Sequence, residues 1–345
     1  MMKFIKIKRG NSLDFNIACP ICSSKLIRSK RKKFNFDNQE ANKYQLFRCS
    51  NCNGEFSWPM RATMDYEKLG GYTIAEFKNT LQESLRRNFV YTALVTFLDL
   101  IKREAILDVG AGLGVSVTHA HNLGFDTYAL EVSNALVNTL NRNCPFSKVC
   151  LSKGENFNLP KTWPYNYDVI SALDVLEHVE NPLKVGKHIY NHLSNDGYFI
   201  ASVPNRERYY YKLGKIIDDF VPKQCGGDNP PYHLTFWREK TIKVFLENLG
   251  FKNYYILKGG LLWRKNISIR GNYSRFLSGL MSILYKNFPK FPLIITKFLE
   301  HFGTHLIVFA QKGDKDGAKL KNFVKILTRR LYKRDIPFFI ECEIK

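Results

Sequence analysis

The fold of this chain is decided by ten residues, Ile106-Leu107-Asp108-Val109-Gly110-Ala111-Gly112-Leu113-Gly114-Val115. The apolar residues end a buried strand, and three glycines then permit a sharp turn at which a ligand can approach the bare backbone. A helix starting after Gly114 would offer free N–H groups to that ligand. The dinucleotide fingerprint would need Gly at 115, where Val stands. Asp108, just before the turn, would repel a pyrophosphate and suits a ligand with a positively charged amine.

A second acidic residue lies downstream of this turn. Glu131 ends the next expected strand, 17 residues after Gly114. A carboxylate in that place can accept both hydroxyls of a ribose, as in other nucleotide-binding folds. The glycines and their two acidic partners therefore predict a site for a nucleoside that carries a cationic group. The alternative is a glycine-rich turn that binds no ligand.

The rest of the chain from Ala105 to about Lys312 alternates short apolar segments with helical patterns. Such alternation is typical of a parallel α/β sheet. Upstream, residues 63–103 carry apolar side chains at helical spacing. Strands are expected at 105–109, 126–131, 148–151, 168–173, 198–203, 254–257 and 305–311, with a helix over 239–248.

Three further segments make the chain resemble the class I S-adenosylmethionine-dependent methyltransferases. Residues 154–160, Gly-Glu-Asn-Phe-Asn-Leu-Pro, are similar to that family's Gly-Asp-Ala-Glu-x-Leu-Pro loop. Residues 174–179, Asp-Val-Leu-Glu-His-Val, resemble the motif after its fourth strand, and Asp196-Gly197 the turn before its fifth. The resemblance implies an α/β fold with a Rossmann-like seven-stranded methyltransferase sheet. It also implies S-adenosyl-L-methionine as the cofactor and methyl transfer as the reaction.

The same resemblance implies roles for individual residues. Asp108 and the glycines would lie against the methionine part of the cofactor, and Glu131 would hold the ribose. Glu155, in place of the usual Asp, would accept the adenine amino group, and Asp174 would flank the sulfonium. The implied cofactor-binding residues are Asp108, Gly110, Gly112, Gly114, Glu131, Glu155 and Asp174.

The acceptor side is expected in the loop beyond the fifth strand, because such loops form the ligand crevice of these sheets. Residues 230–234, Pro-Pro-Tyr-His-Leu, resemble a Pro-Pro-His-His-Leu segment of methyltransferases that often act on sugars or glycolipids. The predicted catalytic residues are His233, as general base for a hydroxyl, and Tyr232, which replaces the first His. The alternative for His233 is a cap on a helix start at 235–237, or packing against Trp237. The Glu177-His178 pair is interpreted as a structural helix start rather than a base or metal ligand.

Four cysteines form two C-x₂-C pairs separated by 26 residues. Two such pairs supply four thiolates for tetrahedral zinc, and a closed four-sulfur site leaves no position open for catalysis. We therefore expect a zinc ribbon with a structural Zn²⁺ on Cys19, Cys22, Cys49 and Cys52. The basic and aromatic run over 30–36 either grips RNA or lies on a module that packs on the catalytic domain.

The chain carries 52 basic and 31 acidic residues in 345, a net charge of +21. This charge favours RNA, anionic lipid or a phosphorylated substrate as partner, or else reflects an A·T-rich genome. Residues 264–290 predict basic amphipathic helices that form a lid or lie on a membrane surface. The chain shows neither a signal peptide nor an apolar run of the about 20 residues that a bilayer requires. We expect a cytoplasmic protein, with peripheral membrane contact as an option.

These features predict four regions. They are a zinc ribbon over 1–62, a helical connector over 63–103, a class I methyltransferase domain over 104–312 with a helical insertion at about 264–302, and a basic C-terminal tail over 313–345. The predicted reaction is O-methylation of a sugar, glycolipid or similar small-molecule acceptor. One alternative is an RNA methyltransferase that uses the ribbon and the basic surface. The other is a zinc-ribbon nucleic-acid-binding protein with an inactive methyltransferase fold, and the intact glycine loop argues against it.

Overall fold

The structure is a computed structural model of the whole chain. It describes residues 17–29, 43–62, 74–101, 104–207, 230–259, 305–313, 317–333 and 340–343. The predicted helical insertion, the basic run at 30–36 and the turn residues before Pro230 lie outside these ranges. Among the helices that the structure describes, none has the length and apolar character needed to cross a bilayer.

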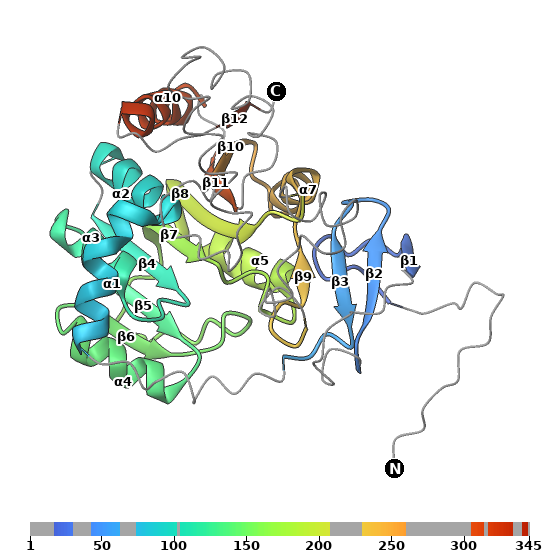
Figure 1. Ribbon diagram of the computed structural model, residues 1–345, viewed down its shortest axis with the longest axis horizontal. Coiled ribbons are helices and arrows are strands. Elements are labelled where there is room, and N and C mark those ends of the chain that lie inside the picture. Colours follow the sequence, from blue (N-terminus) through green and yellow to red (C-terminus); the bar gives the residue numbers. More distant parts are fainter. Residues whose placement is uncertain are drawn as a thin grey trace, which may run out of the picture.

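One large sheet organises the molecule, in the order β12-β10-β11-β8-β7-β4-β5-β6 (Figure 1). Strands β4 to β8 pair in parallel, and β11, β10 and β12 are added antiparallel at one edge. The seven strands from β10 to β6 in this order confirm the predicted methyltransferase sheet, and β12 extends it. The strands are β4 (Ala105–Val109), β5 (Asp126–Glu131), β6 (Lys148–Leu151), β7 (Tyr167–Leu173), β8 (Leu193–Pro204), β10 (Asn253–Gly259), β11 (His305–Gln311) and β12 (Ile340–Glu343).

The strand order reverses at β4. The chain goes from β4 to β5 and β6 on one side, and then returns to β7 and β8 on the other. In open parallel sheets, ligands bind outside the carboxyl ends of the strands at such a reversal. The glycine turn follows β4 directly, so the turn lies at this point.

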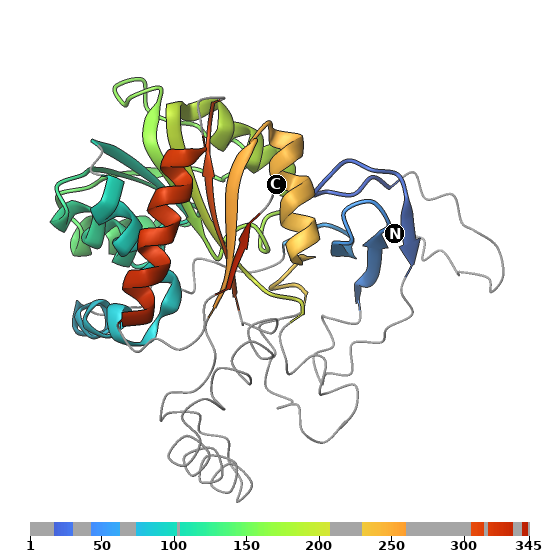
Figure 2. The same cartoon turned by 90° about the horizontal axis from the view of Figure 1, so that it is seen from above.

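Helices cover both faces of the sheet (Figure 2), and alternate strand residues point to opposite sides. Leu107 of β4 shares a core with α5 and α7, whereas Ile106 shares one with α2, α3 and α10. Helix α5 begins with a Pro at its first turn and with Asn181, whose side chain accepts from Lys184 N at 2.9 Å. The helices are α1 (Ile74–Arg87), α2 (Phe89–Ile101), α3 (Val115–Asn122), α4 (Asn134–Asn143), α5 (Pro182–His192), α7 (Glu239–Leu249) and α10 (Ala318–Lys333).

A second, small antiparallel sheet combines strands from two distant parts of the chain. Its order is β1-β2-β3-β9, and its bounds are β1 (Ile27–Ser29), β2 (Gln45–Cys49), β3 (Glu55–Trp58) and β9 (Thr235–Phe236). Three strands come from the cysteine-rich segment, and the fourth comes from the loop after His233. The helix expected over 239–248 is confirmed as α7, which begins at Glu239. The alternative in which His233 caps a helix start at 235–237 is wrong, because Thr235 and Phe236 pair with β3 as strand β9.

Part of the segment 313–345 is regular structure. Helix α10 packs its apolar residues Leu320, Val324 and Leu327 into the core that α2 also lines. Strand β12 pairs with β10 at the edge of the large sheet. These elements therefore belong to the same core as the parallel strands.

Candidate functional site

The glycine turn after β4 has a backbone that other residues would strain. Gly110, Gly112 and Gly114 have φ angles of 72°, 55° and 87°, in the region that favours glycine. A Cβ on Gly110 would lie 2.6 Å from Cγ2 of Val175, which follows β7. Gly110 N donates to Leu130 O at 2.8 Å, so the turn is tied to β5. The turn is therefore held close to both neighbouring strands at Gly110, whereas a Cβ on Gly112 would meet no atom within 4 Å.

Asp108 lies beneath this turn and is closed to solvent. It is 3% exposed, and its carboxylate accepts hydrogen bonds from Ser171 Oγ at 2.6 Å and from Ser116 Oγ. Burial raises the pKa of Asp108 to about 6, and the two serine hydroxyls oppose that rise. Both oxygens have partners from β7 and α3. Because the carboxylate is buried beneath the turn, it could influence a ligand there by its charge through space; the sequence did not point to the two serines.

Glu131 links the end of β5 to the glycine turn. Its Oε2 accepts from Gly112 N at 2.9 Å, and its Oε1 accepts from Val132 N at 2.6 Å. Burial raises the pKa of Glu131, and the hydrogen bonds from these two N–H groups oppose part of that rise. Each carboxylate oxygen has two lone pairs. The residue can therefore keep these bonds and still accept the hydroxyls of a ribose.

Glu155 lies in the loop between β6 and β7, against the start of α5. Its Oε1 accepts from Glu180 N at 3.0 Å, and its carbonyl oxygen accepts from His188 Nε2 at 3.0 Å. The ring of Phe157, two residues on, stacks on His188 with centroids 5.4 Å apart. These contacts fix the loop beside the carboxyl edge of the sheet, where it can border a nucleoside base.

Asp174 follows β7 with a φ of 53° and is fixed by β8. Its N donates to Ser202 O at 3.0 Å, and its Oδ1 accepts from Ser202 Oγ at 2.7 Å. Its Oδ1 also lies 3.9 Å from His305 Nε2, at the start of β11. Burial raises the pKa of Tyr91 in α2, and the negative charges of Asp108 and Asp174 raise it further. The sequence analysis missed Tyr91 and His305, whose only signal was a helical or strand pattern.

The two predicted catalytic residues gather with the Glu177-His178 pair. The ring of His178 lies 4.7 Å from that of Tyr232 and 4.7 Å from that of His233. His178 Nδ1 donates to Tyr232 O at 2.8 Å, which leaves Nε2 as the lone-pair nitrogen, 3.8 Å from Glu177 Oε1. Burial lowers the pKa of His178. Ligand atoms of Glu177, His178 and His233 lie within 4.8 Å of one another, a set that could also hold a cation.

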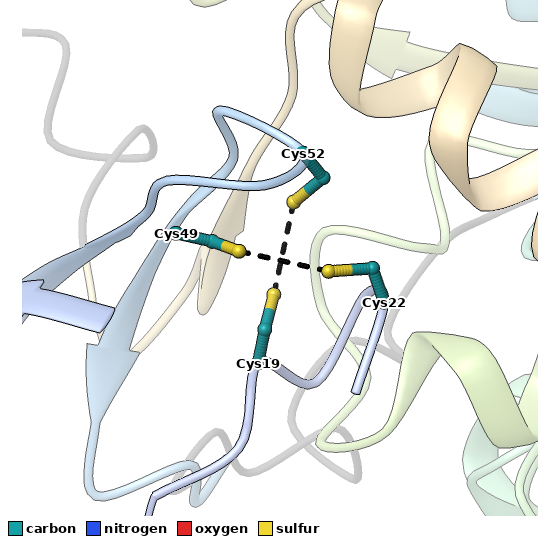
Figure 3. Close-up of side chains that lie close together, drawn as sticks. All are labelled: Cys19, Cys22, Cys49 and Cys52. Atoms are coloured by element: carbon teal, nitrogen blue, oxygen red, sulfur yellow. Dashed lines mark hydrogen bonds between the residues drawn. The ribbon is translucent and has the colours of Figure 1, made fainter. Parts of the chain in front are cut away.

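The four cysteines also come together, as the spacing predicts (Figure 3). Their sulfurs point toward one another from two knuckles, with Sγ–Sγ distances of 3.8 Å for Cys19–Cys52 and 3.6 Å for Cys22–Cys49. A disulfide would bring two sulfurs to about 2 Å. A tetrahedron with metal–sulfur bonds of about 2.3 Å has edges of about 3.8 Å. The cluster has the dimensions of a four-thiolate metal site.

Comparison with known proteins identifies the class. A family model described as a methyltransferase domain matches residues 79–256, more than half of the chain, and the chain belongs to this family. The chain is an S-adenosylmethionine-dependent methyltransferase, as its glycine turn and sheet order predict.

Individual relatives are more distant. The ubiquinone biosynthesis O-methyltransferase of Rickettsia canadensis is 25% identical over 203 residues, which cover 56% of this chain and 84% of that protein. A solved SAM-dependent methyltransferase from Archaeoglobus fulgidus is 16% identical, with a TM-score of 0.44, over 72% of this chain and 97% of that one. Magnesium protoporphyrin IX methyltransferase from Synechocystis PCC 6803 is 14% identical, with a TM-score of 0.44, over 72% and 93%.

Proposed function

We propose that this enzyme methylates a hydroxyl group of a sugar, a glycolipid or a similar small-molecule acceptor. The observation that carries the proposal is the cluster of His178, Tyr232 and His233 beside the carboxyl end of β7. A hydroxyl must lose its proton during methyl transfer, and a neutral histidine can take that proton near pH 7. The relatives named O-methyltransferases support an oxygen acceptor.

We propose that the cofactor lies along the carboxyl ends of β4, β5 and β7. Gly112 supports a bare-backbone cradle for its methionine part, because the space beside this glycine is open, whereas Gly110 and Gly114 are packed against Val175 and Cys144 and fix the turn. S-adenosylmethionine supplies a methyl group on a sulfonium, whose leaving group is a neutral thioether. Little activation of the methyl group is required, so the residues of the chain mainly orient and position the acceptor and the cofactor.

The acidic residues have separate proposed roles in this cradle. Asp108 and Asp174 supply negative charge toward a cationic ligand, Glu131 accepts the ribose hydroxyls, and Glu155 accepts the adenine amino group. Support for Glu131 is its place at the end of β5, where its carboxylate accepts a hydrogen bond from Gly112 N of the glycine turn. Support for Glu155 is the anchoring of its loop by α5.

His233 is the proposed base, with Tyr232 beside it. His233 is 7% exposed and lies in the segment that β3 and the Leu176–Glu177 turn hold from two sides. His178 is the second candidate, because its donation from Nδ1 to Tyr232 O presents Nε2 as a proton acceptor. Substitution of His233 by Ala should lower the rate of methyl transfer by about 10²–10⁴-fold with little change in cofactor affinity. Unchanged turnover in this variant, with a loss in His178→Ala, would assign the base to His178.

A structural zinc ion is proposed for the four-cysteine cluster, since the donor type and the sulfur spacing both fit. Four thiolates occupy all coordination positions of a tetrahedral zinc ion, so we assign the ion no part in the methyl transfer itself. Metal analysis of the purified chain should give one zinc per molecule. A metal-free protein with the same fold would remove this assignment.

The acceptor class is tested by transfer of a labelled methyl group. The purified chain is incubated with methyl-labelled S-adenosylmethionine and separate small-molecule, lipid and RNA fractions of the source cells. Label in the small-molecule or lipid fraction supports the proposal. Label in RNA that ribonuclease releases would instead support the RNA alternative, which the +21 net charge favours. Binding of nucleic acid with no methyl transfer to any fraction would support an inactive binding protein.

A further inference from the structure

The four-cysteine module and the acceptor side of the site are joined by a shared sheet. Strand β3 pairs with β9, with Glu55 opposite Phe236 and Phe56 opposite Thr235, and Ser57 N donates to Leu234 O at 2.8 Å. The segment immediately after His233 is therefore the fourth strand of the cysteine-rich sheet. Figure 1 shows β1, β2 and β3 beside β9, α5 and α7, and away from β4 and β5.

The other edge of the same segment is fixed by the loop that follows β7. Leu234 N and Thr235 N donate to Glu177 O at 2.8 and 3.2 Å, and Thr235 Oγ1 donates to Leu176 O at 3.1 Å. Residues 234–235 are therefore held between β3 on one side and Leu176 and Glu177 on the other. A displacement of β3 would displace this segment, which His233 directly precedes.

A buried cluster of charges strengthens the junction. Glu55 is 1% exposed and accepts from Arg206 Nε at 3.0 Å and from Arg238 Nη2 at 2.8 Å. Arg206 follows β8, and Arg238 precedes α7, so one carboxylate from β3 ties two elements of the methyltransferase domain. Arg238 Nη1 also donates to Asn53 O at 2.7 Å. Buried charges that lose their partner are strongly destabilising, so this geometry is maintained only while Glu55 stays in place.

Glu55 directly follows the second cysteine knuckle. Cys52 and Glu55 are three positions apart, and Cys49 N donates to Gly54 O at 2.9 Å inside the second knuckle. A Cβ on Gly54 would lie 2.8 Å from Cγ2 of Thr241 in α7 and 2.9 Å from Cδ1 of Ile21. The knuckle therefore packs directly on α7 without room for adjustment. The first knuckle makes its own contact, because Leu183 N at the start of α5 donates to Pro20 O at 3.2 Å.

We propose that the four-cysteine ribbon is a positioning element of the acceptor site, with Glu55 as the residue that transmits its position to the segment bearing His233. The inference rests on the proposed function of His233. It places the ribbon away from the glycine turn, since the contacts described above reach β9, α5, α7 and the end of β8. A ribbon that merely stabilised the fold would not set the environment of the His233 ring in the native state.

The test compares Glu55→Gln with the wild-type full chain. Hydrogen exchange should become at least about tenfold faster over residues 234–237, and the ring resonances of His233, assigned with His233→Gln, should move. Affinity for S-adenosylmethionine, measured by calorimetry, should stay within about twofold. Asp99→Asn is the matched control, because it also removes one carboxylate from an ion pair, that with Arg330 at 2.7 Å, but on the surface of α2.

The proposal is overturned if exchange over 234–237 or the His233 resonances are unchanged in Glu55→Gln. It is also overturned if cofactor affinity falls together with them, since the whole domain would then be loosened. Should Glu55→Gln fail to fold, Arg206→Met replaces it with the same readouts, because the Glu55–Arg238 pair remains. None of these readouts needs an acceptor, so they succeed or fail independently of the hydroxyl-methylation proposal.

Discussion

Asp108→Asn should make the protein more stable and a weaker binder of its cofactor. Asp108 is almost fully buried, and burial raises its pKa from 3.8 to about 6. The amide has nearly the same size, and it can still accept a hydrogen bond from Ser171 or Ser116. The substitution therefore removes the charge beneath the glycine turn with little change in packing.

The stability effect follows from the direction of the pKa shift. Because the folded protein raises the pKa of Asp108, the wild type loses stability as pH rises from about 4 to about 6, and the loss persists above it. A shift from 3.8 to about 6 corresponds to about 3 kcal/mol at about 1.4 kcal/mol per pKa unit. Asp108→Asn should raise the free energy of unfolding by up to that amount at pH 7. Near pH 3.5, where Asp108 is mostly protonated in both states, the gain should disappear.

The binding effect has the opposite sign. A cationic ligand is attracted to the ionised form of Asp108, so its apparent affinity falls as that carboxylate takes up a proton. With a pKa of about 6, the wild-type dissociation constant for S-adenosylmethionine should rise about tenfold between pH 7 and pH 5. Protonation of Glu131, whose pKa is also raised, acts in the same direction. Asp108→Asn should bind more weakly at pH 7 and lose its own share of this pH dependence.

Calorimetry at pH 7 and pH 5, together with urea denaturation at pH 7 and pH 3.5, measures both effects. Asp99→Asn removes an exposed carboxylate and should leave affinity and its pH dependence unchanged. If Asp108→Asn binds the cofactor as tightly as the wild type at pH 7, its charge has no role in binding. If the variant is less stable than the wild type at pH 7, the sign of the burial argument is wrong.

Two further predictions concern the turn and the cysteines. Gly110→Ala should weaken cofactor binding at least about tenfold, because its Cβ would meet Val175 at 2.6 Å and its φ is 72°. Gly124→Ala, with a φ of 89° but open space around the Cβ, should cost about 1–2 kcal/mol of stability and leave affinity unchanged. Equal losses of cofactor affinity in the two variants would show that backbone strain alone, and not the position at the turn, weakens binding. Cys52→Ser should remove the bound metal and speed hydrogen exchange over 234–237, whereas full metal content in this variant would exclude Cys52 as a ligand.

The large sheet could be predicted because its strands carry local signals. Apolar runs alternate with helical patterns, and each run pairs with neighbours in an order that the connections restrict. The glycine turn was also visible, since its glycines and Asp108 are adjacent in the chain. Glu131 could be placed because the end of a second parallel strand must lie beside the end of the first.

Features that depend on distant pairing could not be predicted. Strand β9 is two residues long and exists because β3, from far upstream, offers an edge. Ser171 lies 63 residues from Asp108, and Glu55 lies 183 residues from Arg238, so no local pattern links either pair. The short segment of β12 likewise carries no period that distinguishes it from a tail.

A crystal structure of the chain with S-adenosylhomocysteine tests the central assignment most directly. The ribose hydroxyls should be within hydrogen-bond distance of Glu131, with the amino acid part of the ligand over Gly110 and Gly112. A ligand bound elsewhere, or one that leaves the end of β4 untouched, would contradict the site described for this methyltransferase.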